Sequence, residues 1–198
     1  NEARCKVALK VPGEHNILNS LAAIAAAVTL GIDLDTAVMG IAGYSGVDRR
    51  FQVKGVCSGF TIIDDYAHHP AEITATLKAA RHYPHKKLWC VFQPHTYTRT
   101  KAFLPEFAKA LSLADHVILA KIYSAREADI YGVSSADIQR LIAKEGTPCE
   151  YFESFPEIES FIKDNCKEGD VVITMGAGNI LEVGEDLLSP ELSTVTAP

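Results

Sequence analysis

Strand-like runs alternate with helical patterns from Phe51 onward, and this alternation limits the possible folds more than any other feature of the sequence. A hairpin is expected first, formed by FQVKGVC and FTIID. The later strand-like runs are KLWCVF, HVILA, VVITM and a weaker EYF. Helical patterns separate them at about 71–83, 101–113, 135–145 and 156–166. Because strands that alternate with helices form a parallel sheet covered on both faces, the sequence predicts an α/β fold.

The part of the chain before Phe51 has a different character. KVALKV at residues 6–11 is strand-like, and the Ala-rich segment after it predicts a buried helix from about Glu14 to Leu30. A second helix is expected in DLDTAVMGIAGY, with Asp33 or Asp35 as its N-cap. The boundary between the two parts is predicted near GYSGVDRRF, where Gly, Ser and Asp interrupt the pattern.

Composition excludes several classes of function. The chain has 198 residues, a formal charge of −6 and 47% hydrophobic residues, which is typical of a globular protein. It has no Lys/Arg-rich stripe for nucleic acid and no apolar run near the roughly 18 residues of a membrane span. Its five cysteines are odd in number and form no C-x-x-C pair. This pattern predicts neither a disulfide framework nor a zinc site, and it indicates a reducing, cytoplasmic compartment.

Four of the expected strands end in clusters of polar side chains. These are Asp64 to Pro70 after FTII, Gln93 to Arg99 after LWCVF, Lys121 to Glu127 after VILA, and Gly176 to Asn179 after VVITM. In sheets of this type, ligands bind beyond the carboxyl ends of the strands. Helix capping explains any one such loop equally well, but capping does not require Tyr, His and Arg together. We therefore expect the four loops to form one site.

Basic residues and glycines near these loops are candidates for holding an anion. Gly176 and Gly178 would let backbone N–H groups approach an anion at a helix N-terminus, although a G-A-G triplet is a weak signal. Arg49, Arg50 and Arg99 could clamp a phosphate or carboxylate, since the guanidinium fork matches such oxygens. A surface ion pair is the more common role of such arginines, and the place of Arg49 and Arg50 at the predicted domain boundary adds weight to the clamp.

The histidines divide into two groups. His68, His69 and His95 lie in the polar loops, where they could serve as metal ligands, bases or hydrogen-bond donors. A metal is disfavoured because no H-x-x-x-H pair and no nearby Cys is present. The histidines expected to be solvated are His82, His85 and His116.

The start of the Ala-rich helix carries an unusual polar group, formed by His15, Asn16 and Asn19. A helix cap would account for one of these side chains but not for three. Asn amides carry paired donors and acceptors that match the edge of a purine base, so a role in binding a nucleotide is the alternative.

Six segments together point to a known family: GEHNILNSLAAIAAA, GVDRRF, DDYAHHPAEI, FQPHTYTRT, IYSAREADIYGVSS and MGAGNI. In order and spacing they resemble the Mur ligases of bacterial peptidoglycan synthesis, over residues 10–185. That family combines a UDP-sugar-binding domain, a central ATPase domain and a Rossmann-like C-terminal domain. The resemblance implies that residues 1–49 end the central ATP-binding domain, that 50–188 form the C-terminal domain, and that 189–198 are a tail.

The resemblance implies ATP-dependent amide bond formation. In the family reaction ATP phosphorylates the muramate carboxylate, and the incoming amino group attacks the acyl phosphate. The motifs are most similar to those of members that join L-alanine to UDP-N-acetylmuramate, so these are the expected small-molecule partners. No G-x-x-x-x-G-K-[ST] loop is present. The chain is therefore expected to be a fragment, inactive without its own N-terminal and central domains, which should also supply most ligands of a magnesium ion.

The resemblance also implies roles for individual residues, matched motif by motif. Catalytic roles fall on Arg50, Asp65 and His68, and no residue of this chain is expected to bind a metal. Binding of ATP falls on His15, Asn16, Asn19, Arg50 and Asp65. Binding of the other substrates falls on Tyr66, His69, His95, Arg99, Tyr123, Arg126 and Glu127.

The sequence leaves three alternatives to this interpretation. The first is the recycling ligase of the same family, which joins a preformed tripeptide to UDP-N-acetylmuramate and more often has Phe in place of Tyr66. The second is a stand-alone nucleotide-binding or regulatory module. The third, a dehydrogenase, is disfavoured because no G-x-G-x-x-G follows the first strand. If the first 45 residues or so belong to a larger domain, their helix should expose apolar surface.

Overall fold

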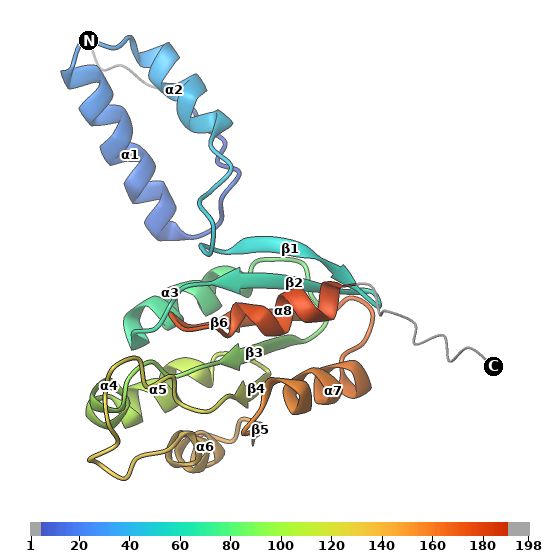
Figure 1. The fold of residues 1–198 in the computed structure, drawn as a ribbon. Coiled ribbons are helices and arrows are strands. Elements are labelled where there is room, and N and C mark those ends of the chain that lie inside the picture. Colours follow the sequence, from blue (N-terminus) through green and yellow to red (C-terminus); the bar gives the residue numbers. More distant parts are fainter. Residues whose placement is uncertain (1–4, 190–198) are drawn as a thin grey trace.

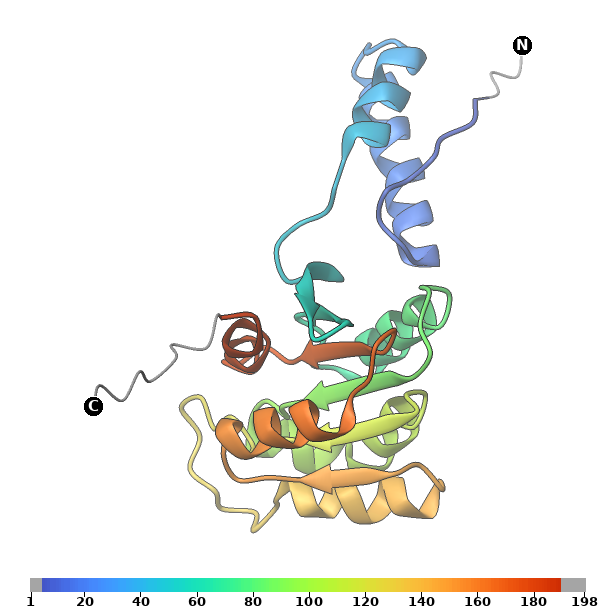
Figure 2. The same ribbon diagram turned by 90° about the vertical axis from the view of Figure 1, so that its right-hand side faces the viewer.

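The structure, a computed structural model, describes residues 5–189 and contains two regions of different build (Figure 1). A pair of helices, α1 (Glu14–Thr29) and α2 (Leu34–Gly43), stands beyond one edge of a sheet domain. Figure 2 shows this helical pair at one end of the molecule and β5 (Cys149–Tyr151), the strand at the far edge of the sheet, at the other. The predicted tail lies outside the described residues, apart from Ser189.

The sheet has six strands in the order β1-β2-β6-β3-β4-β5. Their bounds are Gln52–Cys57 for β1, Phe60–Asp65 for β2, Leu88–Phe92 for β3, His116–Leu119 for β4, Cys149–Tyr151 for β5 and Val171–Met175 for β6. The hairpin β1–β2 is antiparallel, and the other four pairings are parallel. The predicted mostly parallel sheet is confirmed, and the carboxyl ends of β2, β6, β3 and β4 meet at one edge.

Helices cover both faces of the sheet, as predicted. Because side chains alternate along a strand, Ile63 of β2 enters one core and Ile62 enters the other. The first core contains residues of α3 (Pro70–Ala80), α5 (Leu104–Leu111) and α6 (Ser135–Lys144). The second contains residues of α7 (Phe155–Asn165) and α8 (Leu181–Leu188).

The helix expected at 101–113 is divided into two. The short α4 (Tyr97–Ala102) ends at Phe103, and α5 begins at once with Pro105 in its first turn. Proline lacks a backbone N–H and is therefore tolerated at a helix start but not in its interior. Pro105 accounts for the division.

Both helices form where they were predicted, but α1 is not the buried helix that was expected, since Ile24 is its one buried residue. Asp33 is the N-cap of α2, where it accepts hydrogen bonds from Asp35 N and Thr36 N. The strand expected at 6–11 is wrong, because this segment is irregular. A strand needs a neighbour for its backbone hydrogen bonds, and within residues 5–189 no strand pairs with this segment.

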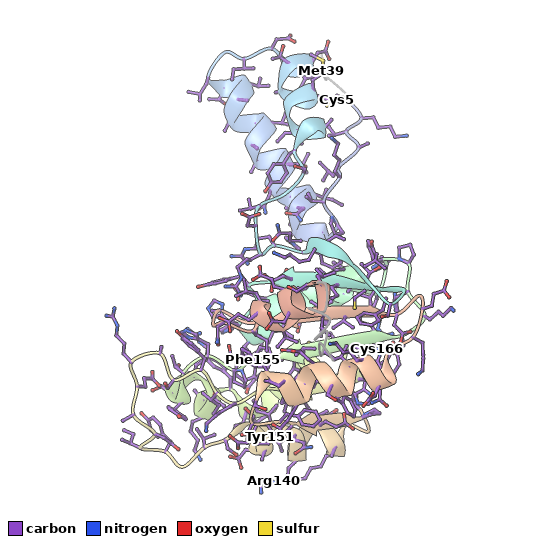
Figure 3. All side chains as sticks on the ribbon, turned by 45° about the vertical axis from the view of Figure 1, so that its right-hand side comes forward. Cys5, Met39, Arg140, Tyr151, Phe155 and Cys166 are labelled. Atoms are coloured by element: carbon purple, nitrogen blue, oxygen red, sulfur yellow. The ribbon has the colours of Figure 1, made fainter. Side chains whose placement is uncertain are left out.

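The helical pair buries little of its apolar surface. Ile24 and Ala37 are the buried residues of α1 and α2. Large apolar side chains of the region are exposed, namely Ile17, Leu18, Leu21, Val28, Leu30, Ile32 and Met39. Figure 3 places Met39 and Cys5 at the outer end of the pair, far from the sheet. The expected exposure of apolar surface in this region is confirmed. Among the helices of residues 5–189, none combines the length and apolar character needed to cross a membrane.

Candidate functional site

Residues 44–51, the connector, link the helical pair to the sheet domain. Asp65, the last residue of β2, joins this connector to the turn that follows the strand. Its side chain is almost fully buried. Oδ2 accepts a hydrogen bond from Phe51 N (2.8 Å) and Oδ1 accepts one from Ala67 N (2.8 Å). Burial raises the pKa of Asp65, and these N–H groups, the Thr76 side chain and the charge of Arg50 oppose the rise. Both carboxylate oxygens are thus engaged by the backbone.

The neighbouring Asp64 is buried and anchors Arg49. Arg49 Nε donates to Asp64 Oδ2 (3.0 Å), and Arg49 Nη2 donates to the backbone oxygen of Gly176 (2.7 Å). Thr174 Oγ1 donates to the other carboxylate oxygen of Asp64 (2.8 Å). Arg49, which the sequence suggested as a possible anion clamp, therefore binds groups of the protein itself at the edge of the sheet.

The turn from Tyr66 to His69 ends in a helix cap. The His69 side chain accepts a hydrogen bond from Ala71 N (3.3 Å), and Glu72 Oε2 accepts from the backbone N–H groups of His68 and His69. This is a capping box with His in the position usually held by Ser or Thr. Burial by itself raises the pKa of Glu72, but the hydrogen bonds and the charge of His68 outweigh it and leave the pKa below its ordinary value. The helix start therefore engages the His69 ring, although substrate binding was expected of it.

Four rings form a continuous row across the carboxyl edge of the sheet. The ring centroids of Tyr66 and His68 are 5.4 Å apart, those of His68 and His95 are 6.0 Å apart, and those of His95 and Tyr123 are 5.5 Å apart. The loops after β2, β3 and β4 each contribute to the row. The structure thus brings together four of the predicted site residues from three segments of the chain.

Two buried nitrogen atoms beside this row lack a hydrogen-bond partner within residues 5–189: His95 Nδ1 and Arg99 Nη1. Burial lowers the pKa of His95, and the positive charges of Arg99 and His68 lower it further, while Glu127 opposes them. Polar atoms that are buried without a partner carry a free-energy cost that a bound ligand can remove. The pair fits a ligand that brings hydrogen-bonding oxygen atoms.

The loops after β3 and β4 are held together. Glu127 Oε2 accepts a hydrogen bond from Thr98 N (2.9 Å), and this bond lowers the pKa of Glu127. Thr96 N donates to the backbone oxygen of Tyr123 (2.9 Å). Arg126 lies exposed in the same loop. Glu127 therefore orients the neighbouring loop at the start of α4.

The two glycines after β6 serve packing, where we expected them to admit an anion. A Cβ atom on Gly176 would lie 2.8 Å from the backbone oxygen of Gln93. One on Gly178 would collide with Gln93 Oε1 and approach the Tyr123 ring to 2.8 Å. The side of each glycine on which a Cβ atom would lie is filled by protein atoms, which the weak G-A-G signal did not reveal. Gln93, which the sequence did not single out, holds Asn179 through its Nε2 (3.2 Å).

All five residues expected to bind ATP line one cleft of about 600 Å³ between α1, the connector and α3. His15, Asn16 and Asn19 contribute from α1, Arg50 from the connector and Asp65 from β2. Glu72 and Thr76 of α3 also line it, although no role was expected of either side chain. Asn16 Nδ2 donates to the backbone oxygen of Pro12 (2.7 Å), which fixes the orientation of this amide.

The remaining histidines lie away from both groups. His82 is exposed and His85 is half-buried, but the expectation of a solvated His116 is wrong. Its ring stacks on Trp89 with centroids 4.2 Å apart, and it lies between Lys87 and Glu150. Strand β5 and α7 cover this position, which the pattern of β4 alone could not show. Within residues 5–189 no group of three or more His, Cys, Asp and Glu side chains is arranged to hold a metal ion.

Comparison with known proteins agrees with this architecture. Residues 49–178 match the model of the family described as "Mur ligase, glutamate ligase domain". The UDP-N-acetylmuramate–L-alanine ligases of Agathobacter rectalis and Lachnospira eligens are 59% and 56% identical to this chain, over 92% of its length. The chain spans only 40% of the length of each.

A solved structure gives the same result. The crystal structure of the UDP-N-acetylmuramate-alanine ligase of Thermotoga maritima superposes with a TM-score of 0.79 at 33% identity. The match covers 93% of this chain and 39% of that one. The family model, the sequence identities and the shared fold lead to one conclusion: the chain belongs to the Mur ligase family.

Proposed function

We propose that this chain is the C-terminal part of a cytoplasmic UDP-N-acetylmuramate–L-alanine ligase, which forms an amide bond through an acyl phosphate at the expense of ATP. The observation that carries the proposal is the identity of more than half of the aligned residues with two proteins of that name. In this proposal the UDP-sugar site and the phosphate-binding loop belong to the part of the ligase outside this chain.

The cleft between α1 and α3 supports the binding of ATP. It offers amides and an imidazole on one side, and Ala71, Ala75 and Ala79 form an apolar wall on the other. A purine ring needs both, because its faces are apolar and its edge carries donors and acceptors. Bound ATP would supply the phosphoryl group that activates a carboxylate. Arg50 would neutralise phosphate charge, and His15, Asn16 and Asn19 would orient the nucleoside end.

In this proposal Asp65 also has a structural role beside its contact with ATP. Its two oxygens hold Phe51 and Ala67, so the carboxylate keeps the connector against the turn that carries Tyr66 and His68. In this proposal most ligands of the magnesium ion belong to the part of the ligase outside this chain.

The row of rings and the two unpartnered nitrogens support an oxygen-rich substrate at the carboxyl edge. Arg99 Nη1 and His95 Nδ1 would bind oxygen atoms of the muramoyl group or of the amino acid. Tyr66, His68 and Tyr123 would wall the site and exclude water, which protects an acyl phosphate from hydrolysis. Arg126 and Glu127 would complete the rim, and His69 would act through the start of α3.

The test is phosphate release by the complete ligase that contains this chain. ATP and UDP-N-acetylmuramate would be supplied with L-alanine in one reaction and with the tripeptide of the recycling ligase in another. Release that depends on L-alanine supports the proposal, and release only with tripeptide assigns the chain to the recycling ligase. The 198-residue chain alone should release no phosphate. Turnover by the chain alone would contradict its assignment as a part of the enzyme.

A further inference from the structure

We propose that Arg49 is a positioning residue: it fixes the connector to the sheet domain, so that Arg50 keeps one place beside the cleft and the pivot between the two regions lies before Arg49. The proposal concerns a residue that the resemblance leaves without a role. Its connection with ATP rests on the proposed function, whereas its mechanical part stands on the geometry of the connector.

The side chain of Arg49 is bound to two strands of the sheet. Its guanidinium donates to Asp64 at the end of β2 and to the backbone oxygen of Gly176 just after β6. The Asp64 side chain is only 2% exposed and that of Arg49 is 22% exposed, so water competes little for these bonds. Because one acceptor lies on β2 and the other just after β6, the planar guanidinium fixes the residue in direction as well as in distance.

The backbone around Arg49 is held as firmly. Tyr66 N donates to the Arg49 backbone oxygen (2.7 Å), and Arg49 N donates to Gln52 Oε1 (3.0 Å). Arg49 and Phe51 both adopt left-handed backbone angles, with φ of 60° and 47°. Residues other than glycine adopt this conformation uncommonly and at a cost in free energy, which the surrounding hydrogen bonds offset here. Arg50 lies between two such residues, and its direction is therefore set by its neighbours.

The two arginines point to different places. Arg49 enters the edge of the sheet, whereas Arg50 lines the cleft that also contains His15 and Asn19. Both guanidinium groups lie near the Tyr66 ring, at 4.9 Å for Arg49 and 5.9 Å for Arg50. Loss of the Arg49 bonds would free this arrangement and move Arg50 away from the cleft.

The segment just before Arg49 has the properties of a pivot. Residues 44–47 have no regular structure, and Tyr44 and Val47 are 43% and 58% exposed. Gly46 has a φ of 106°, a conformation open to glycine. Relative motion of the helical pair and the sheet domain is thus assigned to residues 44–47, while residues 49–51 move with the sheet.

The first arm of the test uses the chain itself and needs no activity. Backbone 15N relaxation should give residues 49–51 the order parameters of β2 in the wild type and lower values in Arg49→Gln. Arg81→Gln is the matched control, because Arg81 likewise bonds an aspartate, Asp115 (2.8 Å), and a backbone oxygen, that of Leu113 (2.9 Å), away from the connector. Unchanged order parameters at 49–51 in Arg49→Gln would overturn the proposal.

The second arm uses the complete ligase. Arg49→Gln should raise KM for ATP about tenfold, equivalent to about 1.4 kcal/mol, with little change in kcat or in KM for L-alanine. Arg49→Lys, which can keep one of the two bonds, should recover part of the loss. A merely structural role would reduce the amount of active enzyme and hence the apparent kcat, with KM for ATP unchanged, and that result would overturn the proposal.

A further variant, Asp64→Asn, tests the same ion pair from its other side and keeps the test decisive if Arg49→Gln misfolds. Asp64→Asn keeps the size of the side chain and an acceptor for Thr174 but removes the ion pair, so the same rise in KM for ATP is expected. A wild-type value of KM in both variants would contradict the proposal. If the wild-type ligase releases no phosphate with either acceptor, the proposed function fails, and the relaxation arm alone decides the role of Arg49.

Discussion

The helical pair and the sheet domain both contain well-formed helices, but they differ in how much apolar surface those helices bury. α1 is Ala-rich and has a high intrinsic helix propensity, yet Ile24 is its one buried residue. α7 contains β-branched and aromatic residues and buries Ile158 and Ile162 against the sheet. Local propensity forms a helix, but a core forms only where an apolar face finds a partner. The sheet domain has such partners on both faces, and the helical pair presents its apolar surface to solvent.

The largest difference should appear when the two regions are separated. A chain of residues 48–189 should unfold cooperatively with nearly the midpoint of the full chain, because both of its cores are complete. A peptide of residues 5–47 should lose most of its helical far-UV circular dichroism, since isolated helices of roughly 12–15 residues are marginal in water. A cooperative thermal transition of the 5–47 peptide would contradict the comparison.

Truncation of one core side chain in each region should give the next largest difference. Phe107 is fully buried, with the Phe92 ring 5.5 Å away, so Phe107→Ala should lower the free energy of unfolding by about 3–5 kcal/mol. Ile24→Ala should change the unfolding of the sheet domain by less than about 0.5 kcal/mol. Trp89, the single tryptophan and buried in the sheet domain, is the fluorescent probe for both variants. Equal losses in the two variants would show that the regions unfold as one unit.

Removal of a helix cap should sharpen the comparison at a smaller scale. Ser154 and Glu157 form the capping box of α7, and Ser154→Ala should lower the unfolding free energy by about 1 kcal/mol. Asp33→Ala removes the cap of α2. It should reduce helical ellipticity without moving the transition that Trp89 reports. A shift of that transition in Asp33→Ala would couple α2 to the sheet domain.

The smallest effect is expected from pH and concerns His95 of the sheet domain. The pKa of His95 is lowered in the folded state by burial and by the charges of Arg99 and His68. As pH falls below about 6.5, the unfolded state takes up this proton first, so stability should decrease down to the folded pKa. Urea unfolding curves recorded at several pH values give the unfolding free energy as a function of pH. His95→Gln should remove the part of this pH dependence that His95 contributes. If the unfolding free energy changes with pH equally in the wild type and in the variant, the assigned environment of His95 is contradicted.

Much of the sheet domain could be predicted because its signals are local. Each strand is a short apolar run, and Ser134 and Ser154 begin α6 and α7 as conventional capping boxes. The expected strand at 6–11 failed for the opposite reason, since an extended segment becomes a strand only beside a partner. The convergence of polar loops also followed from topology, because the carboxyl ends of parallel strands share one edge.

Side-chain roles at the site were harder to predict, since they depend on contacts between distant segments. Arg49 and Arg50 are adjacent and chemically identical, but Asp64 and Gly176 draw one into the sheet edge and leave the other in the cleft. Gly178 looked like part of an anion site and is needed for the approach of Gln93 and Tyr123. No periodicity in the sequence distinguishes these outcomes.

The packing of α8 against β1 has a consequence for how such a domain can be inherited. Lys54 of β1 pairs with Glu185 of α8 (3.0 Å), and Gly55 leaves room for the Leu188 side chain. The first strand and the last helix of the domain are therefore neighbours, and the chain enters at one end of β1 and leaves beside the other (Figure 1). Domains whose ends adjoin tolerate insertion and circular permutation. A segment that begins with β1 and ends with α8 can thus be moved between proteins as a unit.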